Sequence, residues 1–248
     1  ALEGMKRPDS LQLPAAALDV KGSRTVRPGY GRHEMDKLLD LLANHPLSVE
    51  LIAPHLKELT PKQICADFGA LLETFTNADA KESRNQGLRA SLEFSRRRLN
   101  PSAQALLPWL AWFEGGVFED NIIDLAEIEP DKWDAIRAEL EATALIKVET
   151  DGIQVNKRPY IRFHPTLAYA ARADEVPDPE AAGQRFIGVY LQVMGLADHL
   201  LKGQQPAAGM ALMAREEANF RRALSAAAAR GLRSELQNLA DTLRLYLE

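Results

Sequence analysis

The stretch LIKVETDGIQVNKRPYIRF, residues 145–163, decides the fold, because strand-type residues replace helical periodicity here. β-Branched and aromatic residues flank Asp151-Gly152, a dipeptide that favours the tight turn of a β-hairpin. Before this stretch, apolar residues recur three and four positions apart, which predicts helices at about 88–99, 101–113, 119–127 and 131–144. Helices followed by a β-hairpin wing are the element order of a winged-helix domain, which we expect over residues 87–175.

In the part of the chain before this domain, the apolar pattern predicts a helical bundle over residues 33–86. Leucines between positions 38 and 42 lie on one side of a first helix, and a second apolar stripe begins at Val49. Thr60-Pro61 starts a third helix that ends near Phe75, because proline is favoured at the first helical position. Residues 76–87 are polar and predict a linker. Residues 1–32 contain scattered prolines and glycines and predict an irregular linker.

The part after the winged helix, residues 176–248, is rich in alanine and leucine. It predicts helices at about 179–202, 206–230 and 232–248, with breaks at Gly203 and Gly231. Such breaks favour antiparallel helix pairs, as at the start of a tetratricopeptide-type array. The sequence therefore predicts a mainly α fold. It consists of a helical bundle, a winged-helix domain with a small β-hairpin, and α-α helical repeats.

Composition excludes several classes of function. A net charge of −5 gives no electrostatic footprint for nucleic acid or an anionic membrane. No apolar run approaches the roughly 20 residues that a membrane span needs. The single cysteine, Cys65, cannot form an internal disulfide, which fits a reducing compartment, so we expect a cytoplasmic protein. Because the chain begins with Ala1 and ends within a helical pattern, we interpret it as a piece of a longer protein.

Four short motifs occur in a characteristic order. They are LLANHPLSVELIAPHL (41–56), Phe113-Glu114-Gly115-Gly116 after a leucine-rich helix, Arg162-Phe163-His164-Pro165, and EEANFRRAL (216–224). In this order they resemble the helical lid, winged helix and repeat start of STAND-class signalling ATPases, the AP-ATPase and NB-ARC-like group. The resemblance covers residues 33–248. The family's P-loop domain, which would precede the lid, is absent, since the chain contains no Gly-Lys dipeptide.

The resemblance implies two nucleotide-binding residues. Pro46 matches the proline of the family's Gly-x-Pro element, which contacts adenine, although Asn44 replaces the glycine. His164 matches the winged-helix histidine that contacts the β-phosphate of ADP. A histidine at a helix N-terminus can donate a hydrogen bond to an anion. The alternatives are that Pro46 only starts a helix and that His164 only caps a helix over residues 165–173.

The resemblance also implies a regulatory rather than a catalytic role. The chain would couple the ADP or ATP state of the parent to partner binding or oligomerisation. We expect no catalytic residue, no metal site and no activity from this chain alone, and ADP or ATP as cofactor only in the full-length parent, a P-loop ATPase. The expected partners are the upstream P-loop domain of the same protein, a protein ligand on the helical repeats, and further copies of the full-length protein.

The alternative function is a winged-helix DNA-binding transcriptional regulator with a helical-repeat interaction domain. The helix at 131–144 would then enter the major groove. It carries Asp131, Asp134, Glu139 and Glu141 against Lys132 and Arg137. Phosphate repels such an acidic helix. Three consecutive arginines at 96–98 lack interleaved aromatic residues and predict an exposed helix side. We therefore expect no nucleic-acid partner.

Overall fold

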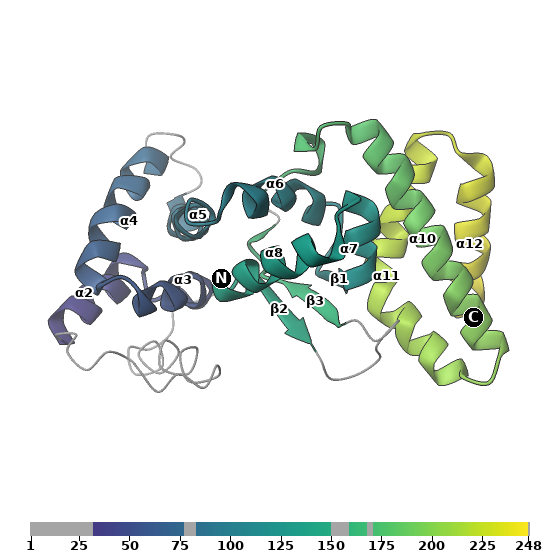
Figure 1. Ribbon diagram of the computed structural model, residues 1–248, viewed down its shortest axis with the longest axis horizontal. Helices are drawn as coiled ribbons and strands as arrows, with labels where there is room; N and C mark the ends of the chain where they lie inside the picture. The colour runs from purple at the N-terminus through teal and green to yellow at the C-terminus, as the bar shows by residue number, and fades with distance from the viewer. Residues whose placement is uncertain (1–31, 77–82, 150–158, 168–170, 248) are drawn as a thin grey trace. The chain divides into compact units, whose positions relative to one another are not determined.

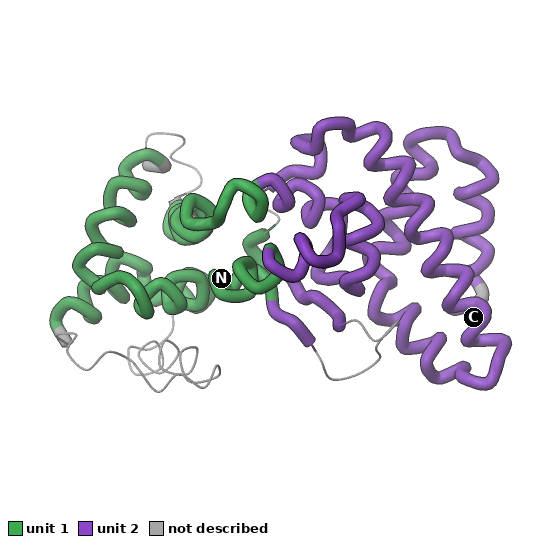
Figure 2. Tube along the Cα trace, viewed as in Figure 1, with its two compact units in different colours: residues 1–104, 136–146, 164–170 green, residues 105–135, 147–163, 171–248 purple. Residues whose placement is uncertain are grey.

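The computed structural model describes residues 32–76, 83–149, 159–167 and 171–247. These residues form helices and one small three-stranded antiparallel sheet (Figure 1), which confirms the predicted mainly α fold. Two compact units result from the packing (Figure 2). Unit 1 comprises residues 1–104, 136–146 and 164–170, and unit 2 comprises residues 105–135, 147–163 and 171–248. The four-part domain division stays a prediction. Within the described ranges, no helix is long and apolar enough to cross a membrane.

Unit 1 is built around a helical bundle. Its N-terminal elements are α2 (Arg32–Leu41), α3 (Pro46–Ile52), the 3₁₀ turn η1 (Ala53–Lys57), α4 (Pro61–Thr76) and α5 (Ser83–Arg96). α4 begins where Thr60-Pro61 predicts it, because Thr60 and Gln63 form a capping box of reciprocal hydrogen bonds. α5 begins earlier than predicted and contributes Ala90 and Phe94 to the core shared with α2, α3 and α4.

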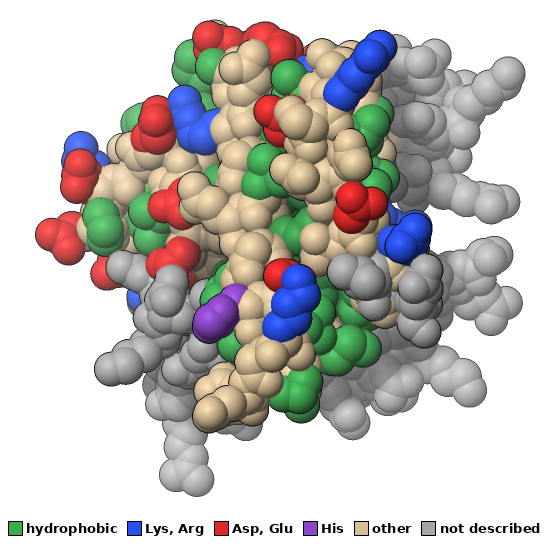
Figure 3. All heavy atoms as spheres, turned by 90° about the vertical axis from the view of Figure 1, so that its right-hand side faces the viewer, with side chains coloured by type: hydrophobic (Ala, Val, Ile, Leu, Met, Phe, Trp, Pro, Cys, Tyr) green, Lys and Arg blue, Asp and Glu red, His purple; other side chains and the backbone are tan. Residues whose placement is uncertain are grey.

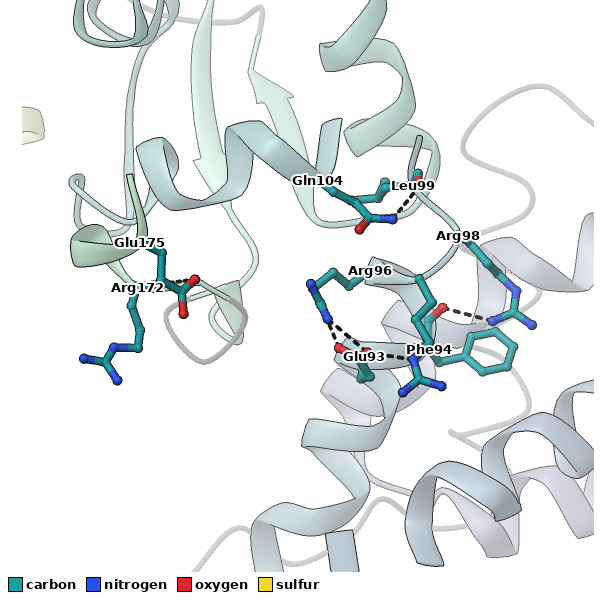
Figure 4. Close-up of polar contacts among 9 residues, drawn as sticks. Glu93, Phe94, Arg96, Arg98, Leu99, Gln104, Arg172 and Glu175 are labelled. Carbon is teal, nitrogen blue, oxygen red and sulfur yellow. Dashed lines mark hydrogen bonds and ion pairs between the residues drawn. The ribbon is translucent and has the colours of Figure 1, made fainter. Parts of the chain in front are cut away.

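The three consecutive arginines at the end of α5 and just after it contact neighbouring residues, as Figure 4 shows for Arg96 with Glu93 and for Arg98 with Phe94. Arg96 and Arg97 both donate to the carboxylate of Glu93, at 2.6 and 2.7 Å from their Nε atoms. The Arg98 guanidinium lies 3.4 Å from the centre of the Phe94 ring and also pairs with an acidic side chain of α4. These contacts agree with an exposed helix side rather than a basic patch for phosphate.

The next elements follow the winged-helix order of helix, strand, two helices and two strands. They are α6 (Pro101–Leu110), β1 (Gly116–Phe118), α7 (Glu119–Ala126), α8 (Pro130–Ala142), β2 (Ile146–Glu149) and β3 (Tyr160–Phe163). The strand order is β1-β3-β2, and Val117 of β1 lies opposite Ile161 of β3. The sequence predicted the wing but not β1, which is three residues long. The predicted turn at Asp151-Gly152 lies outside the described residues.

The end of β3 leads into a tight turn at residues 165–166, where the sequence predicted the start of a helix over 165–173. Leu167 is helical, and residues 168–170 lie outside the described residues. The carbonyl of His164 accepts from the Leu167 N–H at 2.8 Å, which closes the turn. Arg172 is extended, with φ −118° and ψ 138°, so the predicted helix is wrong at that residue. A 3₁₀ turn, η3 (Ala173–Glu175), follows.

Unit 2 continues with α10 (Pro179–Lys202), α11 (Pro206–Ala229) and α12 (Arg233–Leu247). α10 packs along α11, and α11 along α12 (Figure 1). α10 begins where it was predicted because Asp178 caps it and Pro179 follows. Acidic and basic side chains are interspersed on the face shown in Figure 3, a charge distribution that does not favour a polyanionic ligand there.

Candidate functional site

Pro46 occupies the first position of α3, after a turn with unusual backbone angles. Ala43 and Asn44 are both left-handed, with φ of 52° and 51°. Asparagine tolerates this region better than most residues other than glycine. Asn44 thus adopts a conformation that glycine favours, although it replaces the glycine of the Gly-x-Pro pattern. His45 is extended, and the fixed φ of Pro46 then suits the start of the helix.

His164 is buried at the end of β3, with its side chain only 2% exposed. Its Nδ1 lies 2.7 Å from the hydroxyl of Thr166 and accepts from the Thr166 backbone N–H at 3.3 Å. Because Nδ1 accepts, the proton of a neutral ring is assigned to Nε2. The Nε2–H makes no hydrogen bond to any residue that the structure describes. The turn therefore uses one ring nitrogen and leaves the other as a donor.

The unused nitrogen of His164 faces the helix that carries Pro46. Nε2 lies 3.7 Å from Oε2 of Glu50, which is beyond hydrogen-bond distance. Glu50 follows Pro46 by four residues, so both lie on one side of α3. Unit 1 thus contains both predicted residues and brings His164 to α3. Their nucleotide-binding role stays a prediction.

Further buried polar atoms without partners lie at the start of α3. Among the described side chains, five buried nitrogen or oxygen atoms lack a hydrogen-bond partner. Three of them are Nδ1 of His45, Oγ of Ser48 and Nε2 of His164. Buried polar groups are usually satisfied, so each unsatisfied one calls for a specific explanation, such as an ordered water, an ion or a functional role. Sequence reasoning missed Ser48 and Glu50, and only their positions two and four residues after Pro46 could have suggested them.

The Gly-Gly loop, residues 113–116, forms a second polar site in unit 2. Gly115 has φ +73°, a left-handed conformation that strains residues with a side chain. Gly116 approaches β3 so closely that a Cβ atom there would lie 2.6 Å from the carbonyl oxygen of Ile161. The two positions therefore require glycine for different reasons. Gly115 is needed for its backbone angle, and Gly116 for the close approach of β3.

The side-chain amide of Asn219, on α11, binds the backbone of this loop through both its oxygen and its nitrogen. Its Oδ1 accepts from the N–H of Glu114 at 2.6 Å, and its Nδ2 donates to the carbonyl of Gly116 at 2.8 Å. Asn219 is fully buried, so these bonds are shielded from water. Two motifs that lie a hundred residues apart in the sequence, EEANFRRAL and Phe-x-Gly-Gly, thus form one junction.

Glu216 completes the junction one turn earlier on α11. Its Oε2 accepts from the Tyr190 hydroxyl at 2.7 Å and from Asn219 at 2.9 Å, and its Oε1 accepts from the Phe118 N–H at 3.3 Å. Glu216 has no exposed surface, and this burial raises its pKa to about 7 although the hydrogen bonds oppose the rise. Burial also raises the pKa of Tyr190, so its hydroxyl keeps its proton.

The raised pKa of Glu216 predicts that unit 2 becomes less stable as the pH rises. The ordinary value is 4.5 and the folded value about 7, so between these the folded chain binds the extra proton. The contribution of Glu216 to the free energy of unfolding is complete below pH 4.5 and lost above pH 7, and it amounts to about 3 kcal/mol. Urea unfolding at pH 5 and pH 8 should show this loss, and Glu216→Gln should reduce it. Glu217→Gln, at a neighbouring exposed ion pair, should leave it unchanged. An equal pH dependence in Glu216→Gln would contradict the assignment.

The sequence supplied only part of this junction. Glu216 and Asn219 were noticed as motif residues, but nothing in the sequence linked them to Tyr190 or to the loop backbone. Arg221, the arginine of the same motif, lies on the exposed side of α11 and pairs with Glu217, four residues before it.

Comparison with known proteins finds a similar chain among the solved structures. Neither a family model nor a curated protein matches the chain. The structure is similar to part of a crystal structure from Pyrococcus horikoshii, a Signal Transduction ATPase with Numerous Domains (STAND) protein with a tetratricopeptide repeat sensor. The TM-score is 0.42 at 15% sequence identity. The match covers 99% of this chain and 35% of that protein, so this chain spans about a third of its length.

Proposed function

We propose that this chain is the regulatory and scaffold portion of a nucleotide-switched STAND signal-transduction ATPase. It would couple the ADP or ATP state of the parent to partner binding or oligomerisation. The order of the four sequence motifs supports this function. The observation that carries it is the buried Nε2–H of His164, which has no hydrogen-bond partner among the described residues and faces the helix of Pro46.

The chemistry of the two residues suits a nucleoside diphosphate. A neutral imidazole with Nδ1 engaged offers Nε2–H to a phosphate oxygen, and hydrogen bonds to charged groups are the stronger ones. The rigid apolar ring of Pro46 can pack on a flat base. A nucleotide contacting both residues would tie α3 to the turn after β3. Only different contacts with ADP and ATP can make this a switch, since equal affinity for two states shifts neither.

A purely structural role for His164 explains the hydrogen bonds of only one of its two ring nitrogens. The turn 164–167 requires Nδ1, which meets Thr166, and the backbone carbonyl. It does not require Nε2, which is buried and makes no hydrogen bond within the described part of the chain. Leaving a buried donor unsatisfied costs about 1–3 kcal/mol, so a ligand that accepts from Nε2 would remove this cost.

The DNA-binding alternative finds no support in the exposed side chains of α8. Asp131 and Asp134 are exposed on α8 beside a single exposed cation, Lys132. In the wing, Arg162 pairs with Glu149 at 2.6 Å. A helix of this charge would meet repulsion at the phosphate backbone.

Replacing His164 with alanine tests the proposal in the full-length parent. We expect ADP affinity to fall about 5- to 150-fold, the equivalent of 1–3 kcal/mol for a hydrogen bond to a charged group, and activation to become easier. Isothermal titration of ADP measures the first effect, and the oligomeric state with and without the activating signal measures the second. His199→Ala, at an exposed position of α10, is the control and should change neither. If ADP affinity and activation are unchanged in His164→Ala, His164 is only a turn residue.

A further inference from the structure

A buried histidine of unit 1, His55, joins the end of α3 to α5. His55 belongs to η1, the turn that follows α3, and is only 9% exposed. Its Nε2 lies 3.1 Å from the hydroxyl oxygen of Ser95 on α5, and this hydroxyl donates to the backbone carbonyl of Leu51 in α3 at 3.3 Å. Because the single hydroxyl proton goes to Leu51, we assign the other hydrogen bond as a donation from Nε2–H of His55 to Ser95. Two hydrogen bonds thus connect η1, α5 and α3.

The surroundings of the His55 ring disfavour a positive charge. The Phe94 ring of α5 packs against the imidazole at an angle of 73°, with 5.1 Å between the ring centres. The Arg98 guanidinium lies 3.4 Å from the centre of the same Phe94 ring. Burial, together with the positive charge of Arg98, lowers the pKa of His55 from 6.5 to about 4.

The charged side chains on the elements around His55 do not offset this effect. The described acids of η1, α3, α4 and α5 are exposed or paired with arginines, namely Glu50, Glu58, Asp67, Glu73 and Glu93. Lys57 of η1 and Lys62 of α4 are exposed to water. The charge that acts on the imidazole is therefore that of Arg98, and it is positive.

We propose that His55 is an acid-sensitive catch, which holds the end of α3 to α5 while its ring is neutral and releases it when the ring is protonated. An imidazolium can still donate to Ser95, but in the closed structure its charge is shielded from water and close to Arg98. Separation of η1 from α5 lets water reach the ring and removes both costs, so protonation favours the open form. Because α3 also carries Pro46, its release disturbs the nucleotide contact, a consequence that rests on the proposed function.

The sign of the pH dependence follows from the lowered pKa of His55. This pKa is about 4 in the closed form and returns to 6.5 when water reaches the ring. The catch is therefore fully effective above pH 6.5 and is lost as the pH falls toward 4. At pH 5 the open form is almost fully protonated and the closed form is not, so the open population should rise about 20-fold relative to pH 7. This direction is opposite to that expected for Glu216 in unit 2.

Amide hydrogen exchange of the whole chain, measured by NMR at pH 5 and pH 7, tests the catch. The measurement uses no nucleotide, so its outcome does not depend on the proposed function. The amides of Val49 and Leu59 report on the catch, because they donate to the carbonyls of His45 and His55. Their protection factors, which correct for the pH dependence of intrinsic exchange, should fall about 20-fold from pH 7 to pH 5.

Matched variants assign the effect to His55. His55→Gln keeps a side-chain N–H for Ser95 but takes up no proton, so its protection factors should change less than about threefold between the two pH values. His33→Gln makes the same substitution at an exposed position of α2 in the same unit, and should fall as wild type does. Ser95→Ala leaves Nε2–H without its acceptor and should lower protection at least about fivefold already at pH 7.

The ring of His55 provides a second measurement that needs no variant. Its NMR signals in the folded wild-type chain should keep the neutral form down to about pH 5. The proposal is overturned if this ring titrates near pH 6.5 in the folded chain. It is also overturned if the protection of Val49 and Leu59 is the same at pH 5 and pH 7, or if folded His55→Gln loses as much protection as wild type.

Discussion

Replacing Asn219 with alanine is expected to lower the free energy of unfolding of unit 2 by about 2–4 kcal/mol. The change removes the acceptor of the Glu114 N–H and the donor to the Gly116 carbonyl, and it takes one hydrogen bond from Glu216. Buried backbone groups that lose their partners cost more than the hydrogen bonds themselves contribute. The loss should therefore exceed that of an ordinary surface substitution several-fold.

Tryptophan fluorescence during urea unfolding measures the free energy of unfolding of unit 2. All three tryptophans, at positions 109, 112 and 133, belong to unit 2. Asn238→Ala on the exposed side of α12 is the control, and it should stay within about 0.5 kcal/mol of wild type. Asn219→Asp should be destabilised further at pH 8 than at pH 5, because a second carboxylate then faces Glu216. A loss below about 1 kcal/mol in Asn219→Ala would show that the junction does not fasten α11 to the loop.

The sequence predicted the elements whose limits are set locally. α10 runs over the predicted residues because its cap, Asp178, and its first proline are adjacent in the sequence. Gly231, with φ +66°, separates α11 from α12 for the same reason. β1 was missed because three residues carry no periodicity, and it becomes a strand only by pairing with β3, more than forty residues later. The predicted helix over 165–173 was wrong at residues 165–166, because the side chain of His164 and its carbonyl close a turn there, and at Arg172, which is extended.

In the candidate sites, too, the sequence predicted what depends on neighbouring residues but not what depends on contacts between distant ones. Pro46 and His164 were found through their motifs, and the start of α3 at Pro46 follows from proline geometry. That the His164 ring lies against α3 depends on tertiary packing, which no local pattern encodes. The same holds for the pairing of Glu216 with Tyr190, since hydroxyl and carboxylate come from different helices. Motif order could indicate that these residues matter together, but not which atoms meet.

Replacing Gly116 with alanine is expected to destabilise unit 2 by about 3 kcal/mol, because the added carbon has no space. It would lie 2.6 Å from the carbonyl oxygen of Ile161 and 2.6 Å from the ring of Tyr160. The carbonyl belongs to the paired strand β3 and cannot move without disturbing the ladder. The ring is also held, since Phe118 packs against it at 5.2 Å and the Arg215 guanidinium lies 3.9 Å from its centre.

The same substitution at Gly195 provides a control in which stability should rise and not fall. Gly195 lies within α10 and is exposed, and apart from the backbone of its own helix no described atom lies within 4 Å of the position that a Cβ would occupy. Alanine there should stabilise unit 2 by about 0.5–1 kcal/mol, because glycine is a poor helix former. Urea unfolding followed by tryptophan fluorescence compares both variants with wild type. If Gly116→Ala were as stable as wild type, β1 could shift away from β3. The second glycine of the Phe-x-Gly-Gly motif would then not be required by packing.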